Sequence, residues 1–294
     1  MKNKYNQWIL VSATALTLTA CGSSGNGTSD GGSENDGGTN EPAKPTQNSI
    51  VHNGTLYGTV VSPTTGRVWL DRNLGADRVC TGSNDEACYG DVYQWGRDYD
   101  GHQDRHSEIT YTQETSLEET SHKFVAQKNR TGSKRNSLEV RDWFTAFGKQ
   151  SKLSEQREER VGTVQEKADY EVIKAYAKKR QAIWSRTDGS SICPVGFRVP
   201  NHLEMGNEGL ANTDNADKRF HSFLKLPNGA LSRGWDGEYY DFSELSDAGG
   251  GASNYWSTSI SYRGATVGIM PKVAISGVYI YAAQALAIRC IKGK

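Results

Sequence analysis

Aromatic and acidic side chains gather in one short segment of the chain, between residues 235 and 241. Aromatic rings offer apolar area to the faces of sugars or peptides, and carboxylates accept hydrogen bonds from hydroxyl groups. The segment therefore predicts a site for a glycan or protein ligand, made of Trp235, Asp236, Glu238, Tyr239, Tyr240 and Asp241. The alternative is a turn whose aromatic side chains cover the core, the commoner use of Trp and Tyr.

Two groups of side chains have the chemistry of metal ligands. The acids Asp236, Glu238, Asp241, Glu244 and Asp247 carry oxygens of the kind that Ca²⁺ binds, but their spacing matches no EF-hand loop, and solvated carboxylates are the simpler interpretation. Residues 100–106 hold two histidines and two aspartates in an unfamiliar spacing, which favours a polar surface loop. The sequence thus predicts no metal site and leaves calcium at the acidic loop as an open alternative.

The motifs of common enzymes are missing from the chain. It has no Gly-x-Ser-x-Gly elbow, no phosphate-binding loop and no His-Glu-x-x-His pair. We therefore expect neither catalysis nor a cofactor. Lys and Arg balance Asp and Glu at 34 each, so no net charge recruits nucleic acid, and none is expected as a partner.

The N-terminus has the pattern of an export signal. Lys2 and Lys4 precede an apolar stretch that ends in Leu18-Thr19-Ala20-Cys21, which resembles a bacterial lipobox. Residues 1–21 are thus predicted to be a lipoprotein signal peptide, with Cys21 acylated and holding the protein to a membrane. Gly22, in place of an aspartate, resembles lipoproteins sorted to the outer membrane, on its periplasmic or surface-exposed face. An ordinary signal peptide is the alternative.

The other four cysteines form an even set in an oxidising compartment, which favours two disulfides. Three pairings are possible, and we prefer Cys80–Cys88, which closes a short polar loop, with Cys193–Cys290, which ties the chain end to a distant segment. A zinc site is the alternative, although no paired Cys or His spacing supports it.

Composition divides the chain behind the signal into a tether and a head. Residues 22–47 are rich in Gly, Ser, Thr, Asn and acids and predict a disordered tether. Within the head, 48–294, β-branched and aromatic runs predict short strands at 56–61, 67–74, 255–261, 265–270, 273–281 and 286–291. The segment at about 150–183 is rich in Glu, Lys, Arg and Ala, with apolar residues at helical spacing, and predicts a charged, surface-packed helical insertion.

Three stretches of the head resemble the Fibrobacter succinogenes major paralogous domain family. They are VWLDRNL at 68–74 with YGDVYQWG at 89–96, CPVGFRVP at 193–200, and YWSTS at 255–259 with IRCI at 288–291. The resemblance implies an α+β, C-type lectin-like domain of small antiparallel sheets and long loops, with Trp69, Trp95 and Trp256 in its core. It departs from the family at the helical insertion.

Lipobox, tether and lectin-like resemblance together lead us to expect a lipid-anchored, non-catalytic binding or adhesion module that recognises a glycan or protein ligand. Fold alone does not fix function. The alternative is a structural lipoprotein that docks into an envelope assembly through its helical insertion.

Overall fold

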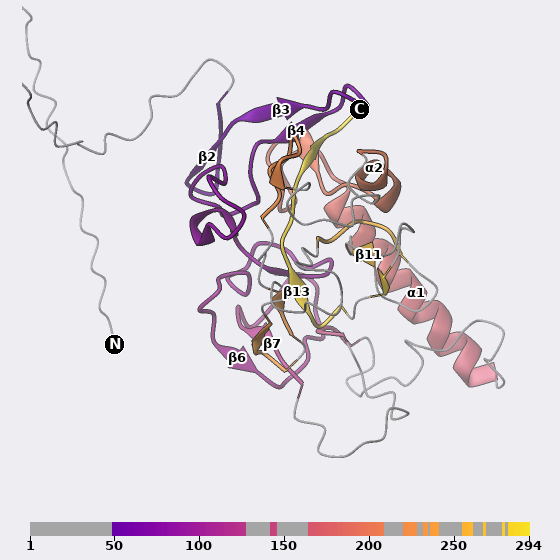
Figure 1. The fold of residues 1–294 in the computed structure, drawn as a ribbon. Helices are drawn as coiled ribbons and strands as arrows, with labels where there is room; N and C mark the ends of the chain where they lie inside the picture. The colour runs from indigo at the N-terminus through magenta and orange to yellow at the C-terminus, as the bar shows by residue number, and fades with distance from the viewer. Residues whose placement is uncertain are drawn as a thin grey trace, which may run out of the picture. The chain divides into compact units, whose positions relative to one another are not determined.

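The computed structural model describes residues 49–127, 142–145, 164–208, 220–227, 232–234, 236–240, 255–260, 267–268, 278–279 and 282–294 (Figure 1). All of them belong to one unit, Lys44–Lys294. The predicted signal 1–21, with Cys21, and the predicted tether 22–47 lie outside the described residues. Within the described ranges, no helix is long and apolar enough to cross a membrane.

Two four-stranded sheets organise this unit. One has the order β3-β4-β14-β8 and consists of the antiparallel strands β3 (Thr59–Val61), β4 (Val68–Leu70), β14 (Ile291–Lys292) and β8 (Phe197–Arg198). The other has the order β10-β9-β13-β5 and consists of β10 (Tyr239–Tyr240), β9 (Ser232–Arg233), β13 (Ala285–Leu286) and β5 (Tyr93–Gln94). The predicted α+β class, built on small antiparallel sheets, is confirmed.

The last residues of the chain connect the two sheets. β13 lies in one sheet and β14 in the other, so the predicted strand 286–291 is broken in the middle. At the break the carbonyls of Ile288 and Cys290 accept hydrogen bonds from the amides of Leu74 and Leu70. The break places Arg289 and Cys290 between the sheets, where both are buried.

Shorter strand pairs complete the β structure. β1 (Ile50–His52) and β2 (Thr55–Tyr57) form a hairpin whose turn residues Asn53 and Gly54 both have positive φ, as a two-residue hairpin turn requires. The remaining pairs are the parallel β6 (Ile109–Thr110) with β7 (Phe124–Val125) and the antiparallel β11 (Val267–Gly268) with β12 (Val278–Tyr279). Of the predicted strand 255–261, the structure shows an isolated bridge from Tyr255 to Ala287.

Helical structure is confined, among the described residues, to three elements. They are α1 (Val164–Trp184), α2 (His202–Gly206) and the 3-10 turn η1 (Glu86–Cys88). The predicted helix at 150–183 is confirmed from residue 164, and 150–163 lie outside the described residues. Within the predicted range its charged face is exposed at Lys178 and Lys179, while Ala177 and Arg180 are buried, and the helix ends one residue later than predicted, at the buried Trp184.

Tryptophans form the centre of the core. Among the described residues, five tryptophans are wholly buried, and each indole N–H has a hydrogen-bond acceptor: Trp69, Trp95, Trp143, Trp184 and Trp256. Four of the acceptors are backbone carbonyls, so the rings fix loops as well as fill volume. Both predicted disulfides are confirmed, Cys80–Cys88 with an S–S distance of 2.02 Å and Cys193–Cys290 with 2.09 Å.

Candidate functional site

The described part of the predicted acidic and aromatic site is the tip of the β9–β10 hairpin. The Oδ1 atom of Asp236 accepts a hydrogen bond from the Glu238 amide at 3.1 Å, and the Gly234 amide donates to the Glu238 carbonyl at 2.7 Å. Gly237 has φ +91°, and a Cβ there would lie 2.7 Å from the Cδ1 atom of Ile109. The turn therefore needs glycine, and it lies directly against β6.

Arg233 holds this hairpin in place. Its Nε atom donates to the Gly237 carbonyl at 3.0 Å, and its Nη1 and Nη2 atoms donate to the hydroxyl and carbonyl of Ser107 at 2.8 and 3.1 Å. The guanidinium lies 4.3 Å from the ring centre of Phe124 and 5.4 Å from that of Tyr239. Arg233 is 4% exposed, so it acts as an internal brace. The sequence does not mark this residue, since an arginine in a short strand carries no signal of burial.

Tyr239 is at once packed and accessible. Its ring lies beside the Arg233 guanidinium, its hydroxyl donates to the Arg105 carbonyl, and the residue is still 36% exposed. Ile109, which contacts the turn, is 38% exposed. Glu238, which directly precedes Tyr239 in the chain, is also exposed. We call Ile109, Asp236, Glu238 and Tyr239 the hairpin surface. It offers an apolar ring and carboxylate acceptors on a braced backbone.

Three predicted site residues do not enter this description. Trp235 and Asp241 lie outside the described residues, as does the side chain of Tyr240. The further acids of the calcium alternative, Glu244 and Asp247, lie outside as well. Among the side chains that the structure describes, no group of three or more His, Cys, Asp or Glu could hold a metal ion.

The segment 100–106 is a loop, as its composition predicts, and Asp104 and His106 are exposed, but His102 and Gln103 are buried. His102 is wholly buried: its Nδ1 atom lies 2.6 Å from the Asp100 carboxylate, and its Nε2 atom accepts from the Gln94 amide at 3.0 Å. Nδ1 therefore carries the proton, and both ring nitrogens are occupied. Burial lowers the pKa of His102 to about 4, against the opposing hydrogen bond to Asp100. The pair supports strand β5, and the surface-loop prediction is wrong for His102, because tertiary hydrogen bonds bury that side chain.

The carboxyl group of Asp91, outside these sites, has a strongly raised pKa. Burial raises the pKa of Asp91 to about 6, and the charge of Asp104 adds to the effect, while the Tyr93 hydroxyl opposes it. The Tyr93 hydroxyl donates to Asp91 at 3.4 Å. A displaced carboxyl pKa is frequent at functional sites and frequent in structural networks as well.

Comparison of the chain with models of known protein families, with curated proteins and with solved structures finds no match. The resemblance carried by the three stretches of the head therefore stays a prediction. A function for the chain rests on the geometry of the hairpin surface.

Proposed function

We propose that the protein is a non-catalytic binding module, anchored by lipid to the bacterial envelope, that recognises glycans through the hairpin surface. One observation carries the proposal: Tyr239 is held by Arg233 and Arg105 and still leaves 36% of its surface accessible, next to the exposed Glu238. The ring would pack against the C–H face of a sugar, and the carboxylate would accept its hydroxyl groups.

The rigidity of the hairpin favours binding. Ordering a free side chain on binding costs about 0.5–1.5 kcal/mol. Because the ring and hydroxyl of Tyr239 already have partners, much of this cost falls on folding and not on binding. Binding sites are also commonly carried by loops that a rigid scaffold positions.

The anchor and the fold belong to the same proposal. Cys21 would carry the acyl chains, residues 22–47 would hold the head away from an outer-membrane surface, and the head would be a C-type lectin-like domain of the resembled family. The small antiparallel sheets joined by long connections support this fold assignment. Labelling cells with an alkyne fatty acid should mark the wild-type chain and leave a Cys21→Ser variant unmarked.

Screening the full-length chain in detergent on a glycan array tests the proposal. Wild type should bind a subset of glycans, and Tyr239→Ala should weaken that binding at least tenfold, a change of about 1.4 kcal/mol. Tyr239→Phe keeps the ring and loses the bond to the Arg105 carbonyl, so its loss should be smaller. Val195→Ala, at an apolar side chain that is 73% exposed, is the control. A blank array, or equal binding by Tyr239→Ala and wild type, would refute the proposal.

The structural-lipoprotein alternative receives less support. It requires a helix that can be removed without damage to the head. The end of α1 supplies Ala177 and Arg180 to the interior, so deletion of 150–183 would remove part of the core and break the helix just before the buried Trp184.

A further inference from the structure

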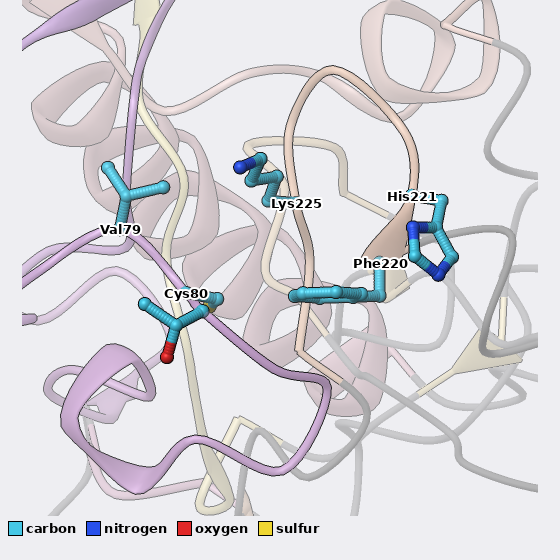
Figure 2. A pocket seen from close by; sticks show the side chains of 6 residues that line it. Val79, Cys80, Phe220, His221 and Lys225 are labelled. Carbon is cyan, nitrogen blue, oxygen red and sulfur yellow. The ribbon is translucent and has the colours of Figure 1, made fainter.

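A cavity of about 510 Å³ lies beside the Cys80–Cys88 disulfide (Figure 2). No residue of the hairpin surface is among its described lining residues. Two segments about 140 positions apart in the chain form it, and they contribute Val79, Cys80, Thr81, Phe220, His221 and Lys225. Its volume is that of a site for a small molecule.

One side of the cavity is apolar. Cys80 and Cys88 are buried, and the half-buried Phe220 ring packs against this disulfide cluster. The His221 ring meets the Phe220 ring edge-on at 5.2 Å between centres, which limits the rotation of Phe220. Figure 2 shows Phe220 and Lys225 facing Val79 and Cys80 across the cavity. The Phe220 ring and the Val79 side chain thus offer apolar area against which an aromatic ring can pack.

Lys225 brings a positive charge to the same cavity. Its φ is +46°, a left-handed conformation that is uncommon for lysine. The neighbours enforce it: Leu224 and Leu226 are buried in the core, and the Leu224 carbonyl accepts from Arg289 at 2.8 Å. Strain of this kind persists only where the surroundings over-determine it, and it concentrates at ligand sites.

The described residues show no carboxylate within ion-pair distance of the Lys225 ammonium. Asp85, which follows the cavity-lining Thr81 closely in the chain, already accepts from Arg78 at 2.9 Å and from the Thr81 hydroxyl at 2.9 Å. Figure 2 shows the ammonium extended toward Val79. The cavity thus combines the Lys225 cation, which has no counterion among the described residues, with an apolar wall.

We propose that this cavity binds a small aromatic carboxylate, with its ring packed against Phe220 and Val79 and its carboxylate on Lys225. The site is independent of the hairpin surface, so glycan binding and carboxylate binding stand or fall separately. A charge-assisted hydrogen bond in a partly apolar site discriminates strongly between an acid and its amide.

Phenylacetate and its neutral counterpart phenylacetamide are the matched probes, titrated against the full-length chain by ligand-observed NMR. Phenylacetate should bind with a Kd of about 1 mM or tighter, and phenylacetamide at least tenfold more weakly. Lys225→Asn removes the charge with a residue that tolerates positive φ, and should erase the preference for the acid. Phe220→Leu should weaken both probes.

Lys292→Asn, at an exposed lysine of β14, is the control and should bind as wild type does. Urea midpoints verify that each variant is folded. Absence of saturable binding, equal affinity for acid and amide, or unchanged binding by a folded Lys225→Asn variant would each overturn the proposal.

Discussion

Arg180 offers the sharpest test of how the helix α1 belongs to the head. Its Nη1 and Nη2 atoms donate to the two carboxylate oxygens of Asp142 at 2.8 and 2.7 Å. The guanidinium lies 4.9 Å from the Trp95 ring centre and 5.6 Å from that of Trp143, and its side chain is 2% exposed. If the helix is integral to the core, Arg180→Met must be costly.

The cost follows from what the substitution leaves behind. Removing one partner of a buried ion pair costs about 3–5 kcal/mol, because the other charge stays buried without compensation. The Asp142 side chain is 15% exposed and keeps some contact with water, so we expect the lower part of that range, about 3 kcal/mol. Asp142→Asn in the Arg180→Met background removes the stranded charge and should restore about 2 kcal/mol. Asparagine still offers an acceptor to the Phe144 amide, which Asp142 binds at 3.2 Å.

Urea unfolding at pH 7, followed by tryptophan fluorescence, measures these differences through the buried rings around the pair. Lys178→Met, an exposed position on the same helix, should change the free energy of unfolding by less than about 0.5 kcal/mol. The reasoning fails if Arg180→Met lies within 1 kcal/mol of wild type, or if the double variant is as unstable as the sum of the single variants.

Two further predictions concern the two disulfides and the carboxyl group of Asp91. In the chain-entropy model, replacing both cysteines by alanine should cost about 4.7 kcal/mol at Cys193–Cys290, with a separation of 97, and about 2.5 kcal/mol at Cys80–Cys88, with a separation of 8; urea midpoints in the reverse order would contradict this. For Asp91, a folded pKa of about 6 above its ordinary 3.8 means that the native state binds the extra proton between these values. Stability should therefore fall as the pH rises from 4 to 6, and Asp91→Asn should stabilise the protein at pH 8 more than at pH 4, measured by thermal unfolding; a pH-independent effect would refute it.

Some features of the fold could be predicted from the sequence alone, because the interactions that cause them are local. The Asn53–Gly54 turn follows from residues that accept positive φ, and the helix from the spacing and propensities of its residues. The two disulfides followed from an even count and loop lengths, although elimination among three pairings needed the structure. Buried tryptophans followed from the resemblance of the motif stretches.

The candidate site could be predicted only in part from the sequence. The clustering of acidic and aromatic residues marked the hairpin tip. The sequence did not mark Arg233, which fixes the hairpin, because its partner Ser107 lies 126 positions away in the chain. The same reason explains His102, whose burial depends on Asp100 and on the backbone of Gln94.

The sequence by itself thus determined the elements with local causes: turns, the charged helix, the cysteine set and the location of a ligand-like segment. The tertiary structure alone decided which charges are internal, since Arg180, Arg233 and Arg289 are all nearly inaccessible. Burying a charge is unfavourable unless its donors are satisfied. The acceptors for these arginines are carbonyl and side-chain oxygens from distant parts of the chain. They come together only when the short strands assemble, so no local sequence pattern predicts them.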